Sequence, residues 1–103
     1  MSEQSTFRNF SEFYPYYLEE HSDVICRRLH FVGSLLVIGV ALYAIISGKL
    51  AWLLLMPVIG YGFAWVGHFI FEKNRPATFQ YPLYSLMGDW VMFRDILIGR
   101  IRF

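Results

Sequence analysis

The sequence predicts an all-α membrane protein built on a transmembrane hairpin of two spans. The predicted spans, residues 23–47 and 50–73, contain the apolar segments Leu29–Ser47 and Leu50–Phe71. Each apolar segment has about the 20 residues that cross a bilayer, and only Gly48 and Lys49 lie between them. The chain has 103 residues, which is enough for one domain at most, and 56% of them are hydrophobic. This fraction is too high for an ordinary soluble domain of this size. We therefore expect a single membrane domain, with an N-terminal interfacial helix before the hairpin and a C-terminal amphipathic or partly embedded helix after it.

The basic residues predict the orientation of this hairpin. Of the nine lysines and arginines only Lys49 lies in the turn, so eight (9 − 1) flank the spans. The eight are Arg8, Arg27, Arg28, Lys73, Arg75, Arg94, Arg100 and Arg102. Because basic residues stay on the cytoplasmic side, we expect a multi-pass membrane protein with both termini in the cytoplasm. The formal net charge of +1 gives no reason to expect a nucleic-acid partner.

Residues 6–20 form the predicted interfacial helix. Ser5 can cap this helix, and Pro15 is expected to kink or restart it. Its aromatic residues recur at spacings of three and four and therefore share one face. These residues are Phe7, Phe10, Phe13, Tyr14 and Tyr17. Such a face suits the membrane interface, where Tyr17 would be an anchor, and it equally suits packing on the rest of the protein.

A helix break is predicted between this segment and the first span. Ser22 or Asp23 can cap the span that follows. In one unbroken helix, His21 and His30 would point to roughly opposite sides, about 13 Å apart along the axis. The two histidines can therefore share a site only if the chain turns near Ser22.

The second span carries small residues on one face. Gly60, Ala64 and Gly67 favour close helix packing, and they make a homodimer a candidate assembly. Pro57 is expected to bend the helix. The span should end before Pro76, which disfavours helical backbone at the preceding residue.

Residues 83–101 form the predicted C-terminal helix. Apolar residues run almost all the way round it, and Asp89, Arg94 and Asp95 interrupt them. We expect this helix to lie on or partly within the cytoplasmic leaflet, packed against the hairpin. The two aspartates are expected to pair with arginines rather than to act in catalysis.

Two histidines lie at matched depths in the hairpin. His30 precedes Lys49 by 19 residues (49 − 30), and His68 follows it by 19 (68 − 49). At about 1.5 Å per residue, each lies roughly 28 Å from the turn, so both should lie near the same, cytoplasmic, membrane face. Ionisable residues within a membrane helix are costly and usually functional.

These histidines and His21 make a candidate metal site. Neutral imidazole is the commonest protein metal ligand, and Glu72 lies one turn after His68 on the same helix face. Three imidazoles and a carboxylate suit iron, zinc or another transition metal. Two alternatives stay open: histidines that only pack, and a haem held between two of them, which would require a dimer.

Arg27 and Arg28 are candidate substrate-binding residues. Because they lie at the start of the first span, their main expected role is to set the orientation of the protein in the membrane. Either could also hold the carboxylate of a fatty acid.

Several motifs resemble one family. Tyr17-x-x-x-His21 and the stretch Arg28-Leu29-His30-Phe31-Val32-Gly33 carry part of the resemblance. The most specific part is Gly67-His68-x-x-x-Glu72-Lys73-Asn74-x-Pro76-Ala77. Over roughly residues 7–98 the chain resembles the Mpo1-like family, formerly a domain of unknown function. It is shorter than the fungal members and is similar to the short bacterial ones, which implies a location in a bacterial inner (cytoplasmic) membrane.

This resemblance implies a function. Characterised fungal relatives are membrane-bound, Fe(II)-dependent dioxygenases that shorten long-chain 2-hydroxy fatty acids by one carbon in α-oxidation. It implies that His21, His30 and His68 are catalytic iron ligands, with Glu72 as a further ligand or a group behind them. A fatty acid or other lipid and the bilayer are then the expected partners. The alternatives are a metal-binding membrane protein without oxygenase activity and a small structural or interaction protein.

Overall fold

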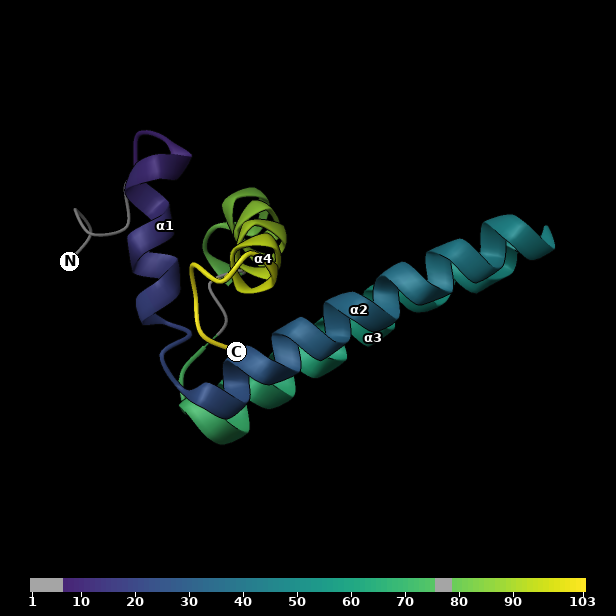
Figure 1. The fold of residues 1–103 in the computed structure, drawn as a ribbon. Helices are drawn as coiled ribbons and strands as arrows, with labels where there is room; N and C mark the ends of the chain where they lie inside the picture. The colour runs from purple at the N-terminus through teal and green to yellow at the C-terminus, as the bar shows by residue number, and fades with distance from the viewer. Residues whose placement is uncertain (1–6, 76–78) are drawn as a thin grey trace.

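The computed structural model describes residues 7–75 and 79–103, which are helical and contain no strand. The predicted all-α class is therefore confirmed for these residues. Figure 1 shows a long helical hairpin that carries a smaller helical head at one end. The elements in chain order are α1 (Phe10–Glu19), α2 (Val24–Ser47), the 3₁₀ segment η2 (Leu50–Leu54), α3 (Leu55–Val66), the π-helical segment η3 (Gly67–Glu72) and α4 (Pro82–Leu97).

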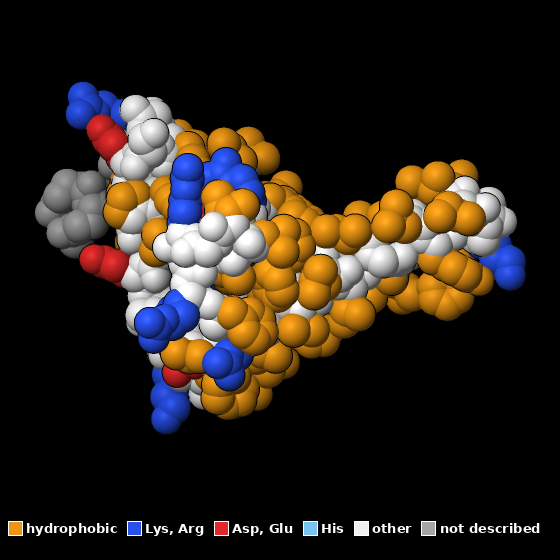
Figure 2. All heavy atoms as spheres, viewed as in Figure 1, with side chains coloured by type: hydrophobic (Ala, Val, Ile, Leu, Met, Phe, Trp, Pro, Cys, Tyr) orange, Lys and Arg blue, Asp and Glu red, His pale blue; other side chains and the backbone are white. Residues whose placement is uncertain are grey.

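The hairpin has the length and surface of a membrane-spanning unit. The helices Val24–Ser47 and Leu50–Glu72 are 24 and 23 residues long, and only 22% and 6% of their most apolar windows are buried. A core helix of a soluble protein would be mostly buried, so these helices are typical of membrane spans. Hydrophobic side chains cover the hairpin in Figure 2, whereas charged side chains gather on the head and at the hairpin tip. The predicted pair of spans agrees with these two helices.

Glycines allow the two arms of the hairpin to approach each other closely. A Cβ atom on Gly67 would lie 3.0 Å from Cys26 Sγ, and one on Gly33 would lie 2.9 Å from Phe63 Cβ. The predicted small-residue packing is therefore confirmed at Gly67, within one chain. At the tip, Gly48 ends α2 with a φ of +76°, in the left-handed region that favours glycine.

Helices α1 and α4 form the head, and they pack together beside the start of α2 (Figure 1). The head core contains Phe13 and Tyr17 of α1 with Met92 and Ile96 of α4. Tyr17 is 1% exposed and fits against Gly88, where a Cβ atom would lie 2.8 Å from its ring. The aromatic face of α1 thus packs on the rest of the protein, which is one of its two predicted roles. The predicted role of Tyr17 as an interfacial anchor is wrong, because its side chain is buried.

The helix boundaries differ from the predictions at three places. Helix α1 begins at Phe10, because Asn9 caps it by accepting a hydrogen bond from Glu12 N at 2.9 Å. The predicted cap Ser5 lies outside the described residues, and α1 continues through Pro15 instead of restarting there. Helix α4 ends at Leu97 rather than at residue 101.

The early end of α4 has a local cause. Gly99 takes a φ of +85°, and Arg100 N and Ile101 N both donate to Asp95 O, at 2.8 and 3.1 Å. These hydrogen bonds use the carbonyl that a further helical turn would need. Residues 98–103 consequently fold back toward the start of α2, where Arg27 and Arg28 contact them.

Candidate metal centre

Three buried histidines meet where the head joins the hairpin. His21 lies in the turn between α1 and α2, His30 in the second turn of α2, and His68 in η3. His21 Nε2 lies 3.0 Å from His30 Nε2 and 2.9 Å from His68 Nε2. One ligand atom from each ring lies within 4.8 Å of the other two. The predicted matched depth of His30 and His68 is confirmed, and one chain supplies all three rings.

An oxygen atom lies at the Nδ1 atom of each of the three rings. His21 Nδ1 lies 2.7 Å from Tyr17 O, His30 Nδ1 lies 2.9 Å from Cys26 O, and His68 Nδ1 lies 2.7 Å from Asn74 Oδ1. A carbonyl oxygen only accepts, so each neutral ring carries its proton on Nδ1 and donates it there. Every Nε2 lone pair is then free, and the three Nε2 atoms face one another.

Two side chains, those of Asp23 and Arg27, hold the turn that contains His21. Asp23 caps α2 by accepting a hydrogen bond from Cys26 N at 3.0 Å, which confirms the predicted helix break. The Arg27 guanidinium donates to the carbonyls of His21 and Ser22 at 3.2 and 3.3 Å. These contacts turn His21 back toward α2, so His21 and His30 can share a site.

A π-helical segment and Asn74 position His68. Lys73 follows η3 with a φ of +61°, and Asn74 N donates to His68 O at 2.9 Å. The Asn74 amide nitrogen donates to two oxygens of Glu20, at 3.0 and 3.2 Å, which directs its oxygen to His68. Asn74 thus joins the end of α1 to the second span. In the sequence, Asn74 stands out only as part of the motif around His68, because its tertiary contacts leave no signal in the residue spacing.

Tyr17 covers the outer side of His21. The two rings stack with centroids 4.0 Å apart and an interplanar angle of 24°. The Tyr17 hydroxyl donates a hydrogen bond to Asp89 Oδ1 of α4. This contact overturns the expectation that Asp89 pairs with an arginine. For Asp95 that expectation is confirmed, since its carboxylate lies 2.9 Å from the Arg94 guanidinium.

Burial sets the protonation of the groups outside the spans. Burial, followed by the neighbouring His30 and His68, holds the pKa of His21 well below its ordinary 6.5. A neutral imidazole is the form that binds a metal ion. Burial also raises the pKa of Asp89 to about 6, against the opposing effect of the Tyr17 hydrogen bond.

The other predicted site residues lie beside this cluster. Glu72 accepts hydrogen bonds from Ser22 Oγ at 2.9 Å and from Asp23 N at 2.7 Å, so its carboxylate holds the His21 turn. Arg27 donates to backbone carbonyls, as described above. The Arg28 guanidinium lies 5.0 Å from the ring centroid of Phe103, and it donates a hydrogen bond to the backbone carbonyl of Phe103 at 3.3 Å. The structure does not bring Glu72, Arg27 or Arg28 into the group of converging nitrogens.

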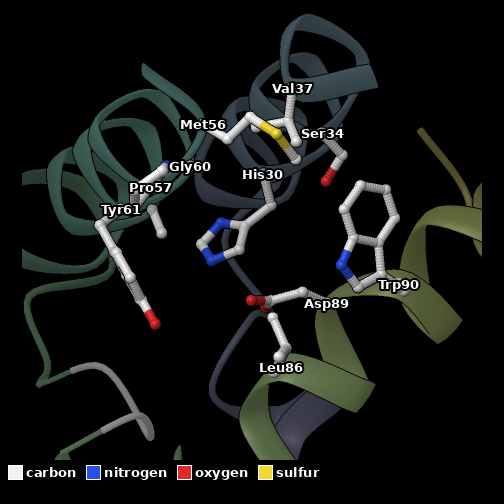
Figure 3. A pocket seen from close by; sticks show the side chains of 11 residues that line it. His30, Ser34, Val37, Met56, Pro57, Gly60, Tyr61, Leu86, Asp89 and Trp90 are labelled. Atoms are coloured by element: carbon white, nitrogen blue, oxygen red, sulfur yellow. The ribbon is translucent and has the colours of Figure 1, made fainter. Parts of the chain in front are cut away.

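A cavity of 250 Å³ extends from His30 along the hairpin, between α2, α3 and α4 (Figure 3). Its wall is mainly apolar. Val37 lies about 10 Å further into the span than His30, and Met56 and Pro57 lie about 16 to 18 Å further in than His68. Asp89 and Trp90 of α4 close the opposite side. An apolar cavity beside a polar cluster is typical of a small-molecule site.

The three histidines fit a transition-metal ion. Two imidazole nitrogens bound at about 2.1 Å and at a right angle lie about 3.0 Å apart, close to the spacing of His21 to His30 and to His68. In addition, three lone pairs that face one another repel unless a cation lies between them. Imidazole sets of this kind suit iron, zinc, copper and nickel.

A family model described as 2-hydroxy-palmitic acid dioxygenase Mpo1-like matches residues 7–101. The chain belongs to the Mpo1-like family. Comparisons with curated proteins and with solved structures gave no match. The Mpo1-like match covers α1, the hairpin and α4 together, so the histidine cluster and the cavity both lie within the family region.

Proposed function

We propose that this protein is an Fe(II)-dependent membrane dioxygenase that shortens a long-chain 2-hydroxy fatty acid by one carbon, as in α-oxidation. The observation that carries the proposal is the convergence of three Nε2 lone pairs next to a cavity that runs along the spans. The family description, 2-hydroxy-palmitic acid dioxygenase Mpo1-like, supports the same reaction class.

The position of the cluster suits a lipid substrate. His30 and His68 lie near the head end of the hairpin, where the apolar surface gives way to charged side chains (Figure 2). A fatty acid in the bilayer carries its carboxylate at this level and its chain in the hydrocarbon region. The substrate could therefore reach the site from the membrane without entering water.

His21, His30 and His68 would hold the iron ion. When bound, the ion supplies Lewis-acid and redox chemistry toward the 2-hydroxy acid and dioxygen. The two backbone carbonyls and Asn74 keep the protons of the three rings on Nδ1, which leaves Nε2 available as the ligand atom. The Tyr17 ring excludes water from the outer side of His21.

The excess of basic residues outside the turn supports an orientation with both termini in the cytoplasm, and the similarity to short bacterial members supports a bacterial inner membrane. The cluster would then face the cytoplasmic leaflet. Lys49 would lie at the opposite membrane face.

Metal analysis combined with a turnover assay tests the proposal. Protein purified without chelator and reconstituted anaerobically should bind about one equivalent of iron, and it should convert 2-hydroxyhexadecanoic acid to a product one carbon shorter. The product is identified by mass spectrometry. His68→Gln should lose both properties. Less than about a third of an equivalent of iron in the wild type would contradict the proposal.

A zinc protein is the second candidate. The group of converging ligand atoms found among the described residues is three histidines without a carboxylate, and three histidines form a known catalytic zinc set. Zinc retained at one equivalent, with no turnover by iron-loaded protein, would favour this candidate over the dioxygenase.

A further inference from the structure

The cavity beside His30 contains one carboxylate, that of Asp89, among the residues that line it. In Figure 3, Asp89 extends from α4 toward the side of the cavity where the His30 imidazole lies. Most of the wall is apolar. A carboxylate in such surroundings is costly unless it is hydrogen-bonded, so a partner for each of its oxygens is expected.

Tyr17 supplies the partner for only one of the two oxygens. Its hydroxyl donates to Asp89 Oδ1, and its ring stacks on His21. No hydrogen bond to Oδ2 is found within residues 7–75 and 79–103, and Oδ2 is not among the enclosed atoms that lack a partner. The second oxygen of Asp89 is therefore directed to the cavity, next to the metal site.

We propose that Asp89 Oδ2 accepts a hydrogen bond from the hydroxyl group of the lipid substrate and thereby selects hydroxylated over unhydroxylated fatty acids. This inference rests on the proposed function. A carboxylate attracts a hydroxyl donor and repels the carboxylate of a fatty acid. The hydroxyl group is therefore the part of a 2-hydroxy acid that this side of the cavity can bind.

A second tyrosine–aspartate pair in the same two helices provides the comparison. Tyr14 donates to Asp95 Oδ2 at 2.8 Å, so this pair also joins α1 to α4. Asp95, however, does not line the cavity, and it pairs with Arg94. Asp89 and Asp95 thus share a role in joining the helices, and only Asp89 is placed to contact a ligand.

Equilibrium binding to zinc-loaded protein tests this selection without turnover. Binding of 2-hydroxyhexadecanoic acid and of hexadecanoic acid is measured in detergent by displacement of a fluorescent fatty acid. The wild type should bind the hydroxylated acid about 10 to 100 times more tightly, as expected for one hydrogen bond to a charged group. Asp89→Asn still accepts from Tyr17 but presents an amide to the cavity, so this ratio should fall to near one. Asp95→Asn should keep the wild-type ratio, and zinc content should stay the same in all three proteins.

Three results would overturn the inference: a wild-type ratio near one, a wild-type ratio retained by Asp89→Asn, or an equal loss in Asp95→Asn. If Asp89→Asn is not recovered folded, Asp89→Glu moves the carboxylate by one methylene and should lower the ratio at constant zinc content. An unchanged ratio in Asp89→Glu would then count against the role of Asp89. Turnover by iron-loaded wild type is measured in parallel. If the wild type turns over but Asp89→Asn keeps the wild-type binding ratio, only the inference about Asp89 is overturned. If Asp89→Asn loses the binding ratio but the wild type does not turn over, only the proposed dioxygenase activity is overturned.

Discussion

At the scale of single residues, the acceptors behind the histidines define the site as much as the histidines do. Three imidazoles could meet with any of their nitrogens, but Tyr17 O, Cys26 O and Asn74 Oδ1 each take one Nδ1 proton. Two of these acceptors are backbone carbonyls four residues before the ring, and helical geometry supplies them. Asn74 is the exception, because a side chain supplies this acceptor and a single substitution can remove it.

Asn74→Ala should therefore weaken metal binding with the three histidines intact. Loss of an acceptor behind a histidine ligand typically costs 10- to 100-fold in metal affinity, and we expect an effect of about that size. Chelator competition on the purified protein measures it. Asn9→Ala is the matched control, since Asn9 caps α1 far from the cluster. That change should cost about 1 kcal/mol of stability at unchanged affinity, and equal losses in both variants would argue against the role of Asn74.

The facing Nε2 lone pairs also predict strong stabilisation of the fold by a metal ion. An ion that binds the folded chain alone, at 100 times its Kd, adds about 2.7 kcal/mol to the free energy of unfolding. Thermal unfolding in detergent, with and without a chelator, should show this as a higher Tm for the loaded protein. His68→Gln should show no such difference. A Tm of the wild type that does not respond to metal would indicate that the histidines only pack.

At the scale of helices, local pattern accounts for the hairpin but not for the head. The apolar lengths, the Gly48 turn and the equal separations of His30 and His68 from Lys49 could be predicted, because they depend on helical rise and hydrophobicity alone. The break at Asp23 could be predicted from capping chemistry. The contacts of Tyr17 and Asp89 could not, since 72 residues separate them, and no periodicity relates α1 to α4. For the same reason, the engagement of Glu72 by the His21 turn could not be predicted from its position one turn after His68.

The start of η3 packs closely against α2 at Gly67, so we expect this position to tolerate no larger side chain without a loss of stability. A Cβ atom on Gly67 would lie 3.0 Å from Cys26 Sγ and 3.2 Å from Cys26 Cα. Gly67→Ala should therefore displace η3, shift His68 and cost about 1–3 kcal/mol as overpacking, with weaker metal binding. Gly62→Ala is the matched control on the same arm, because nothing lies within 4 Å of its added Cβ atom. Unfolding and metal affinity are measured for both variants. A Gly67→Ala protein with wild-type affinity would show that the contact is not needed to position His68.

At the scale of the whole molecule, the head closes only one end of the hairpin. Helices α1 and α4 lie around the histidine end, and the other end carries only the turn at Gly48 and Lys49 (Figure 1). The cavity lies at the junction, with α4 as one wall and the two spans as the others. This asymmetry means that the proposed orientation of the hairpin also decides which leaflet can deliver a substrate.

The orientation leads to a prediction about surface labelling. Cys26 is the sole cysteine of the chain and is buried, so single cysteines can be introduced in a Cys26→Ala background. Arg8, whose side chain is 85% exposed, lies on the head, and Lys49 lies at the tip. With both termini in the cytoplasm, an impermeant maleimide should label Lys49→Cys in intact spheroplasts and Arg8→Cys only in inverted vesicles. Labelling of Arg8→Cys in spheroplasts would reverse the orientation, and it would place the histidine cluster at the outer leaflet. Labelling of both positions from the same side would contradict the two-span hairpin itself, because an antiparallel pair of spans must separate its turn from its ends.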